Sequence, residues 1–401
     1  MTGVYESLGV RTIINAKGPS TRLSGGLMRP EVAAAIAEAS RACVDIAELQ
    51  AAAGRAIAEA TGAEAGLVTS GAAAALLLGT AAALTGLDPA RMARLPDTTG
   101  FANEVVVARS QRNQYDHAVR AAGARLVEVG LPDRVSGAGV RDAESWEYAA
   151  AIGERTAAVL YVAQGEARPA LAEVARVAHA ARVPVIVDAA AQLPPAVNLR
   201  RFIAEGADLV AYSGGKAIGG PQASGILCGR RDLVMAAALQ MLDMDVVFAQ
   251  WSPPPSLIDK ARLVGAPPHG IGRPCKAGKE EIVGLVAALR LFLAEGDAAR
   301  TRRWRGLATD LVAALRGLNG ASVSLRDAGV DGSVPMVELA LAPDAPMTAL
   351  ALATALQDGE PSIHVDPHRL DAGVVLFGPT CLEPDAPALI GRRVHALFRT
   401  A

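Results

Sequence analysis

The segment AYSGGKAIGGPQASGIL, residues 211–227, contains the most informative residue of the sequence. It joins two apolar, strand-like runs through a glycine-rich turn that holds Lys216. Lysine is rare here, since only five of the 39 basic residues are lysines and the other 34 are arginines. Only a primary amine forms an imine with an aldehyde, because the guanidinium of arginine stays protonated. The segment therefore indicates a Schiff-base lysine, the alternative being an exposed loop lysine.

The composition predicts a soluble, cytoplasmic protein. A chain of 401 residues is long enough for two unequal domains, and its net charge of −2 comes from interspersed charges with no basic face for nucleic acid. The beginning of the chain has no secretory pattern, and no stretch is apolar enough to span a membrane. The cysteines are far apart and predict neither disulfides nor a zinc site: Cys43, Cys228, Cys275 and Cys381.

Strand-like and helix-like runs alternate between about residues 65 and 230. Short β-rich runs bounded by glycine, proline or charge fit buried strands, whereas residues 118–123 and 171–181 fit helices. This alternation predicts βαβ units and an α/β fold with a mainly parallel, seven-stranded sheet. The predicted strands are 65–69, 104–108, 125–129, 157–162, 184–188, 209–213 and 225–229.

The rest of the chain predicts a second, smaller domain. The run WSPPPS, residues 251–256, breaks regular structure because stacked prolines sustain neither a helix nor a central strand. After it, the pattern predicts two helices and at least two strands. We expect an N-terminal arm at 1–30, a large cofactor-binding domain at 31–255, and a small α+β domain at 256–401 that includes part of the arm. The predicted elements of the small domain are helices 279–295 and 298–318 and strands 334–341 and 373–377.

The sequence VTSGAAAAL, residues 68–76, is a candidate phosphate-binding loop. It follows a strand and opens an alanine-rich helix, so Ser70, Gly71 and Ala72 would present unpaired N–H groups and a hydroxyl at a positive helix end. No Walker lysine is present, which disfavours a nucleotide P-loop. The alternative is that Thr69 or Ser70 is an ordinary N-cap.

Asp188 ends a strand that is otherwise apolar. At the carboxyl edge of a parallel sheet such a carboxylate faces the ligand crevice, where it can keep a pyridine nitrogen protonated. A helix N-cap or a magnesium ligand is the alternative. Ala190 is small enough for a flat ring to lie against it. Gln192 could reach a ring hydroxyl, and the equally supported alternative is that it is an ordinary surface glutamine.

Lys216 follows Asp188 by one short helix and one strand. Adjacent parallel strands would bring both side chains to one edge of the sheet, where a cofactor held by the Ser70 loop would lie. Ser213 could add a hydroxyl to the phosphate, and Gly214 and Gly215 allow close backbone approach.

These motifs resemble the fold-type I pyridoxal-phosphate enzymes, and more closely the selenocysteine synthase (SelA)-like, D-glucosaminate-6-phosphate ammonia-lyase-like family. The resemblance covers nearly the whole chain, and the lysine motif is its most specific part. It rests on INAKGPSTRLSGG (14–26), ELQAAAG (48–54), VTSGAAAAL (68–76), RSQRNQYDHAVRAAGARLVEVG (109–130), VDAAAQLP (187–194), SGGKAIGGPQASG (213–225) and GIGRPCKAGKEEIVGL (270–285).

The resemblance implies pyridoxal 5'-phosphate as the cofactor, and the sequence pattern predicts no metal site. It implies Lys216 as the Schiff-base lysine and Asp188 as the partner of the pyridine nitrogen. It places Ser70, Gly71, Ala72 and Ser213 around the phosphate.

One position departs from the family pattern. In lyase-like members a histidine on the cofactor ring face precedes the Arg-Asn-Tyr-Asp stretch, and Gln111 stands at that place here. A glutamine cannot relay a proton near neutral pH, which implies a different chemistry or substrate. Of the six histidines, only His269 is a candidate substitute.

An amino-acid substrate needs a cation for its carboxylate, and arginine suits this best. Arg273 is the first candidate, with Arg22 and Arg369 as rivals. In the same motif as Arg273, Lys276 and Lys279 could bind a substrate phosphate, although exposed lysines are the commoner case. Residues near the expected cofactor level also include Arg112, Asn113 and Tyr115.

The sequence thus predicts a homodimeric or larger enzyme that acts on an amino acid or amino-sugar acid through an external aldimine and a Cα carbanion. Elimination with release of ammonia is the first reaction considered, and a racemase, aldolase or aminotransferase is the alternative. Selenium transfer to a tRNA fits poorly without a basic face. A non-catalytic cofactor-binding protein and a sugar-phosphate or nucleotide-binding protein are the other classes.

Overall fold

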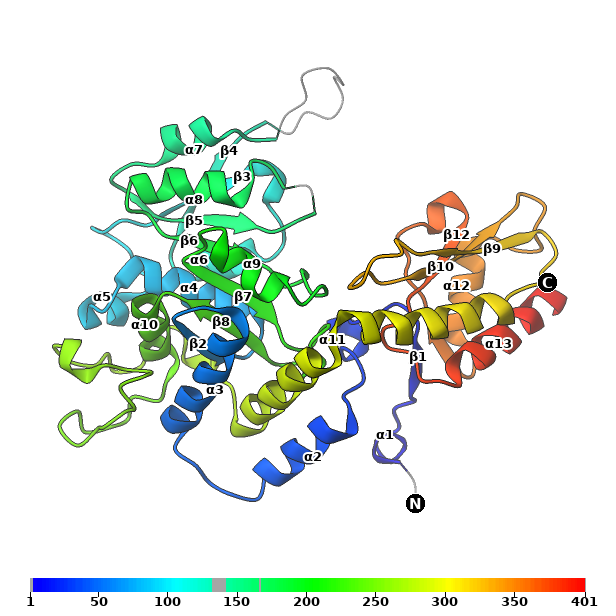
Figure 1. Ribbon diagram of the computed structural model, residues 1–401, viewed down its shortest axis with the longest axis horizontal. Helices are drawn as coiled ribbons and strands as arrows, with labels where there is room; N and C mark the ends of the chain where they lie inside the picture. Colours follow the sequence, from blue (N-terminus) through cyan, green and yellow to red (C-terminus); the bar gives the residue numbers. More distant parts are fainter. Residues whose placement is uncertain (1–2, 132–141, 166, 401) are drawn as a thin grey trace. The chain divides into compact units, whose positions relative to one another are not determined.

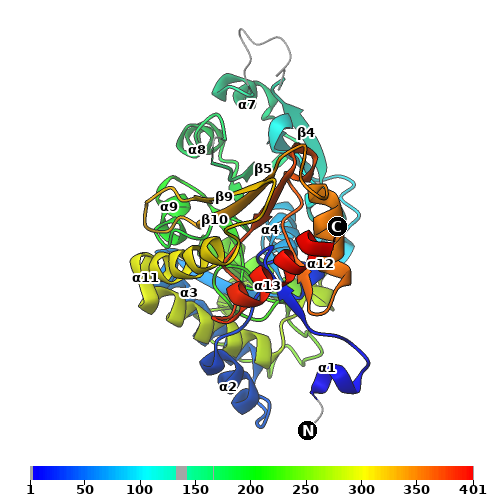
Figure 2. The same ribbon diagram turned by 90° about the vertical axis from the view of Figure 1, so that its right-hand side faces the viewer.

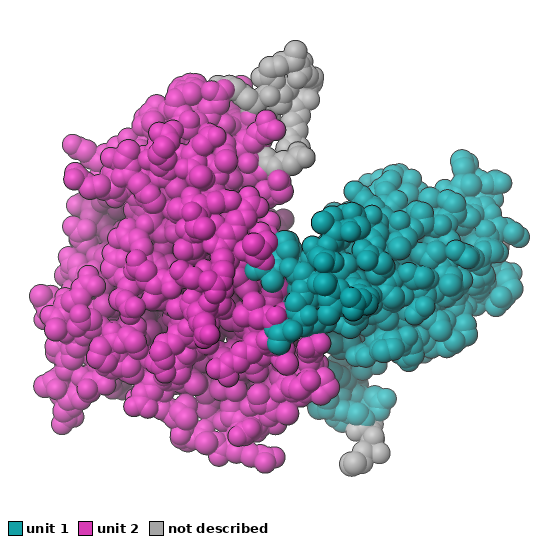
Figure 3. Space-filling model, in the orientation of Figure 1, with its two compact units in different colours: residues 1–27, 194–196, 294–401 teal, residues 28–193, 197–293 magenta. Residues whose placement is uncertain are grey.

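A computed structural model describes residues 3–131, 142–165 and 167–400 (Figure 1). The chain divides into two compact units (Figure 3). Unit 1 comprises Met1–Leu27, Pro194–Ala196 and Ala294–Ala401, and unit 2 comprises Met28–Leu193 and Val197–Leu293. The predicted boundary between residues 255 and 256 falls within unit 2, and the three-part division at 1–30, 31–255 and 256–401 stays a prediction. Among the described residues, no helix is long and apolar enough to cross a membrane.

Unit 2 is built on a seven-stranded sheet, which confirms the predicted α/β fold. The strand order is β2-β8-β7-β6-β5-β3-β4, and β8 runs antiparallel to the other six strands, which share one direction. Each predicted strand lies within one residue of an observed one. The bounds are β2 Ala65–Thr69, β3 Glu104–Ala108, β4 Arg125–Val129, β5 Thr156–Val162, β6 Val185–Asp188, β7 Leu209–Ser213 and β8 Gly225–Gly229.

Helices cover both faces of this sheet (Figure 1). The alanine-rich α4 and α10 share one core with Leu160, Ile186, Leu209 and Leu227 of the strands, while α3, α8 and α9 lie on the opposite face. Burying both faces explains why the strands are continuously apolar. The helices of unit 2 are α2 Pro30–Ala39, α3 Ile46–Thr61, α4 Ala72–Thr85, α5 Pro89–Arg94, α6 Asp116–Ala121, α7 Ser145–Ala151, α8 Leu171–Ala180, α9 Asn198–Ala204 and α10 Arg231–Met241, with short 3-10 turns η2 Arg109–Gln111, η3 Lys260–Arg262 and η4 Arg273–Cys275.

Unit 1 combines a three-stranded antiparallel sheet, in the order β12-β10-β9, with a two-stranded parallel sheet of β1 and β11. Its core joins β10 and β12 to α11, α12 and α13 (Figure 2). The N-terminal arm enters this unit through β1. Unit 1 is therefore an α+β unit that includes part of the arm, as predicted for the smaller domain. The bounds are α1 Val4–Ser7, β1 Ile13–Asn15, η1 Thr21–Leu23, β9 Ala321–Arg326, β10 Met336–Leu341, α12 Ala349–Asp358, β11 Ser362–His364, η5 Leu370–Ala372, β12 Val374–Phe377 and α13 Ala386–Thr400.

The long helix α11, Lys279–Ala314, is interrupted at Gly296. Its backbone there has φ 70° and ψ 163°, a conformation that residues with a Cβ rarely adopt. The sequence predicts two helices, 279–295 and 298–318, and the observed interruption falls between them. The break lies two residues beyond the boundary of the two units at Leu293 and Ala294.

A buried carboxylate, Asp208, links several elements at the amino end of the parallel strands. Asp208 is 6% exposed and accepts hydrogen bonds from the Val185 N–H at 2.8 Å and Arg230 Nη1 at 3.1 Å. It also contacts His179 Nε2 at 2.7 Å. Asp208 directly precedes β7, and its three partners lie in β6, in α8 and just after β8. It thereby ties these elements to the start of β7.

We expect Asp208→Ala to lower the free energy of unfolding of the cofactor-free protein by about 1–3 kcal/mol, because the buried Val185 N–H loses its additional carboxylate partner. Urea unfolding followed by circular dichroism measures this. Asp232→Ala is the matched control, because Asp232 contacts the same Arg230 from the surface. It should cost less than about 1 kcal/mol, and equal losses in the two variants would contradict the assignment.

Candidate active site

The register of the sheet brings the predicted site residues to one edge. Val162 pairs with Asp188, and Asp188 pairs with Ala211, at the carboxyl ends of β5, β6 and β7. Gly225, at the start of the antiparallel β8, pairs with Ser213 on one side and with Thr69 on the other. Asp188, Ser213 and the loop after Thr69 therefore lie along the same edge of the sheet.

The loop after Thr69 leaves a helix N-terminus open. Gly71 is the N-cap residue of α4, with φ 125°, and no side chain caps the helix. The first N–H groups of an α-helix have no partner within the helix, so those at Ala72 and after it can bind an anion. Ser70, Gly71 and Ala72 are half-buried. The alternative of a Thr69 or Ser70 side-chain cap is not observed, since Thr69 donates its hydroxyl to the Gly71 carbonyl at 2.9 Å.

Three contacts brace this loop. The carboxamide of buried Gln50 in α3 accepts from the Val68 N–H at 3.0 Å and donates to the Val68 carbonyl at 2.8 Å. The Ser70 N–H donates to the Cys275 carbonyl at 3.2 Å, so this N–H is already paired. A Cβ added to Gly225 would lie 2.4 Å from the Gly71 carbonyl carbon. The sequence did not predict that Gln50 and Cys275 would support the loop, although Gln50 lies in the family-like motif ELQAAAG, 48–54.

Asp188 is a buried carboxylate held for a ligand. It is 7% exposed, and its Oδ1 accepts the Ala190 N–H at 3.0 Å. Burial raises its pKa above the usual range, while the Ala190 N–H and the charge of Lys216 oppose that rise. The bond to Ala190 closes a turn and caps no helix, because the next helix, α9, starts at Asn198.

Lys216 is a half-buried amine beside this carboxylate. Burial lowers the pKa of Lys216, and Asp188 opposes that shift. Asp188 ends β6 and the Lys216 turn follows the adjacent β7, so both groups lie at one end of the sheet. The turn is tight around the lysine, since a Cβ at Gly214 would lie 2.3 Å from Ser224 Oγ and one at Gly215 would lie 2.7 Å from Gln222 Cα.

Two glutamines bind successive backbone groups at the end of β5. Gln111 is 1% exposed and accepts the Val162 N–H at 2.9 Å, while Gln192 Nε2 donates to the Ala163 carbonyl at 2.8 Å. Because an N–H donor must face the amide oxygen, the orientation of the Gln111 carboxamide is fixed. Its Nε2 is buried and has no partner among the described residues. Gln111 therefore carries a spare donor one strand away from Asp188.

The predicted carboxylate-binding arginines lie in different units. Arg273 belongs to unit 2 and borders a cleft of about 510 Å³ that Lys276, Trp251 and the start of α3 also line. Its Nη2 donates to the exposed Asp243 at 2.7 Å. The Cys275 carbonyl that binds Ser70 lies in the same short turn, η4, so Arg273 is close in the chain to the phosphate loop.

Arg22 and Arg369 belong to unit 1. Arg22 is exposed, and Arg369 donates to Glu338 at 2.8 Å. Other candidates are engaged elsewhere: Arg112 pairs with both Asp116 and Glu128, and Lys279 pairs with Glu280 at 2.7 Å. His269 is exposed and accepts from the Met244 N–H at 3.4 Å; Tyr115 is also exposed, and Asn113 accepts the Tyr115 N–H.

The donor set fits pyridoxal phosphate. An uncapped helix N-terminus suits the phosphate, a buried carboxylate suits a protonated ring nitrogen, and an amine of lowered pKa suits the aldehyde. Within residues 3–131, 142–165 and 167–400, no group of three or more histidine, cysteine or acidic side chains could hold a metal ion.

Comparisons with known proteins find relatives along the whole chain. The family model of L-seryl-tRNA selenium transferase, SelA, matches residues 47–244. A 5'-C-glycyluridine monooxygenase-decarboxylase from a Streptomyces species is 34% identical over 98% of this chain and 92% of its own. A D-glucosaminate-6-phosphate ammonia lyase from Salmonella typhimurium is 32% identical over 99% of this chain and 98% of its own.

A solved structure gives the same result. The structure of a D-glucosaminate-6-phosphate ammonia-lyase superposes over 100% of both chains with a TM-score of 0.81 and 31% sequence identity. The similarity therefore extends over both units and the N-terminal arm.

We expect Gly225→Ala to weaken the affinity for pyridoxal phosphate at least about tenfold, because the added methyl group displaces the loop that presents the Ala72 N–H. Equilibrium dialysis of the cofactor measures this. Gly306→Ala is the control, since its Cβ meets nothing within 4 Å. Unchanged affinity in Gly225→Ala would contradict the assignment of the phosphate loop.

The lowered pKa of Lys216 predicts a pH profile. A lysine of lowered pKa is neutral, and hence nucleophilic, down to lower pH than an ordinary lysine; removing Asp188 removes an effect that raises this pKa. In the cofactor-free protein, the midpoint of Lys216 methylation by formaldehyde and borohydride should therefore move to lower pH in Asp188→Asn. Peptide mass spectrometry measures it. Asp243→Asn should leave the midpoint unchanged, and a midpoint that rises in Asp188→Asn would refute the coupling.

Proposed function

Because the chain belongs to the selenocysteine synthase-like family of fold-type I pyridoxal-phosphate enzymes, we propose that it removes ammonia from a 2-amino-3-hydroxy acid of the amino-sugar class. The chain is a pyridoxal-phosphate-dependent enzyme, and its lyase relative supports this reaction type. The observation that carries the proposal is geometric: buried Asp188 ends β6, the Lys216 turn follows the adjacent β7, and the uncapped start of α4 lies at the same edge of the sheet.

The proposed roles follow from the site. Bound pyridoxal phosphate supplies an aldehyde that condenses with amines and a ring that accepts the electron pair left at Cα. Lys216 holds the cofactor through its Nζ, and Asp188 keeps the ring nitrogen positively charged. The Ala72 N–H, Gly71 and the hydroxyls of Ser70 and Ser213 bind the phosphate, while Ala190, Gln111 and Gln192 contact the ring.

Lys216 is also the proposed proton carrier. Once the substrate amine has displaced it, its neutral Nζ can take the proton from Cα. The β-hydroxyl would then leave as water with that proton, and the Lys216 Nζ would retake its bond to the cofactor and so free the substrate as an enamine. Hydrolysis of the imine tautomer of this enamine would take up one water and release ammonia and a 2-oxo acid. Gln111 cannot donate a proton to the leaving hydroxyl, because an amide does not titrate near neutral pH. This assigns both proton transfers to Lys216.

Arg273 is the proposed partner of the substrate carboxylate. It lies in the same unit as Lys216, and its ion pair with the exposed Asp243 is one that a better-placed carboxylate can replace. The exposed Lys276 on the same cleft suits a distal phosphate. Arg22 and Arg369 are the alternatives.

A second candidate reaction has its own support. The monooxygenase-decarboxylase relative is about as similar to this chain as the lyase is. Cofactor geometry selects which bond at Cα breaks, so the same Lys216 and Asp188 would also serve the loss of a carboxyl group. The products separate the two reactions, because decarboxylation yields CO2 and elimination yields ammonia with all carbons retained.

We further propose a homodimer or larger homo-oligomer in the cytoplasm. The cleft beside Arg273 is bordered by exposed apolar residues, Val44 and Val246, which a second copy would cover.

We expect the purified protein to bind pyridoxal phosphate with a visible absorbance band, and Lys216→Ala and Lys216→Arg to lose the band and the activity. A panel of D- and L-2-amino sugar acids, with and without a terminal phosphate, should release ammonia and a 2-oxo acid. Ammonia and 2-oxo acid assays together with Cα deuterium exchange measure the reaction. A protein that stays colourless with added cofactor would refute the proposal, and CO2 as the product would favour the second candidate.

A further inference from the structure

Three residues of the loop after the cofactor-binding strand β6 belong to unit 1. The chain runs from Asp188 at the end of β6 to Gln192 within unit 2, and Pro194–Ala196 then belong to unit 1. Val197 returns to unit 2, and α9 begins at Asn198. Only Leu193 separates Gln192 from this inserted segment.

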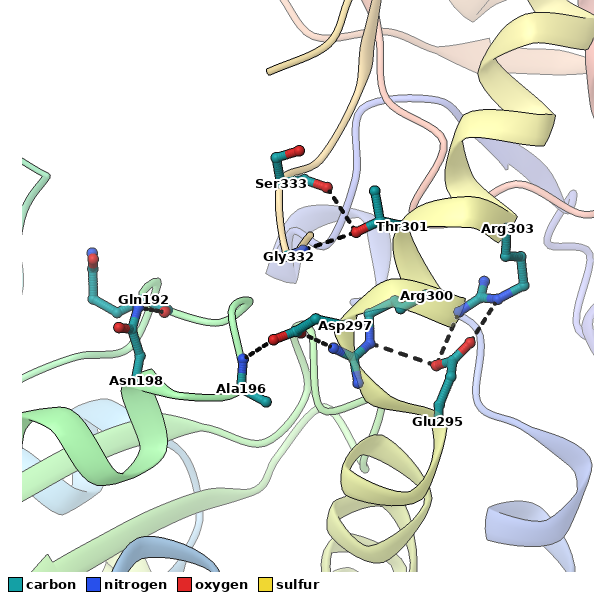
Figure 4. Close-up of polar contacts among 10 residues, drawn as sticks. All are labelled: Gln192, Ala196, Asn198, Glu295, Asp297, Arg300, Thr301, Arg303, Gly332 and Ser333. Carbon is teal, nitrogen blue, oxygen red and sulfur yellow. Dashed lines mark hydrogen bonds and ion pairs between the residues drawn. The ribbon is translucent and has the colours of Figure 1, made fainter. Parts of the chain in front are cut away.

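Residues of unit 1 hold the inserted segment, Pro194–Ala196, by a hydrogen bond and by close packing (Figure 4). Asp297 Oδ2 accepts the Ala196 N–H at 2.8 Å. A Cβ added to Gly332 would lie 2.5 Å from Pro195 Cβ, so the Gly332 backbone packs against this proline. The Gly332 N–H in turn donates to Thr301 Oγ1 at 2.9 Å. The segment is therefore fixed by both a hydrogen bond and close packing.

Asp297 itself is held by a buried cation. Its Oδ1 accepts a hydrogen bond from Arg300 Nη1 at 2.6 Å, and Arg300 is 1% exposed. Glu295 lies 3.5 Å from Arg300 Nε and 3.0 Å from Arg303 Nε. A carboxylate locked in this way keeps a fixed direction for its second oxygen, which is the atom that meets Ala196 (Figure 4).

Gln192 is tied to the site on the other side of the segment. The Gln192 carbonyl accepts from Asn198 Nδ2 at 2.7 Å, and its side chain donates to the Ala163 carbonyl. The Ala163 N–H donates to the Asp188 carbonyl at 2.9 Å. A displacement of Pro194–Ala196 would thus pull on the hydrogen bonds that join the ends of β5 and β6.

We propose that Asp297, anchored by Arg300, is a positioning residue that sets the Gln192 loop through Ala196. Asp297 directly follows Gly296, where α11 is interrupted. The effect on the cofactor rests on the proposed function, in which Gln192 contacts the ring. The effect on the loop is independent of the proposed function.

Hydrogen exchange of the cofactor-free protein tests the loop. Asp297→Ala should raise exchange in residues 189–199 about tenfold, since it removes a hydrogen bond to a charged group. Asp327→Ala is the matched control: Asp327, also in unit 1, accepts the Gly329 N–H at 2.9 Å and pairs with Arg305. It should leave residues 189–199 unchanged. Equal exchange in the two variants would overturn the proposal.

Cofactor release tests the path through Gln192. Asp297→Ala should speed the release of pyridoxal phosphate several-fold, and in Gln192→Ala the same change should add nothing. Full additivity of the two changes would overturn the role of Gln192. A wild-type protein that binds no cofactor would refute the proposed function, while the exchange experiment would still decide whether Asp297 holds the loop.

Discussion

The pairing of the parallel strands β6 and β7, which holds the buried Asp188 carboxylate and the half-buried Lys216 amine at one end of the sheet, is the constraint on which the site depends. Burial disfavours either charge alone, raising the pKa of Asp188 and lowering that of Lys216, and each group partly offsets the penalty of the other. Such a pair is stable only where a rigid frame fixes both groups. The adjacent parallel strands β6 and β7 provide that frame, because Asp188 pairs directly with Ala211.

The same frame sets the position of the anion site. Since β8 runs antiparallel between β7 and β2, its first residue, Gly225, reaches the edge at which its neighbours end. The absence of a side chain there lets the Ser70 loop approach Ser213 across the start of β8. Three sequence segments that are far apart along the chain thus meet along one line, and a phosphate and a ring nitrogen can be held at its two ends.

Local sequence carries most of the fold and part of the site. Apolar runs bounded by glycine, proline or charge predicted every strand of the large sheet. Asp188 could be singled out because it is the acidic residue that ends one of these runs. Contacts between distant segments left no such pattern. The bond from Gln50 to Val68 and the place of Pro194–Ala196 in unit 1 depend on tertiary packing. Arginines were hard to rank because they are common, and the structure separates them by partner, as the ion pair between Arg369 and Glu338 shows.

The role of Lys216 as the Schiff-base lysine is tested by reducing the protein with borohydride after incubation with pyridoxal phosphate and mapping the attached group by peptide mass spectrometry. We expect one pyridoxyl group per chain, on Lys216, and a loss of this labelling in Lys216→Arg. Labelling on Lys260 or Lys276 instead, or no stable labelling at all, would contradict it.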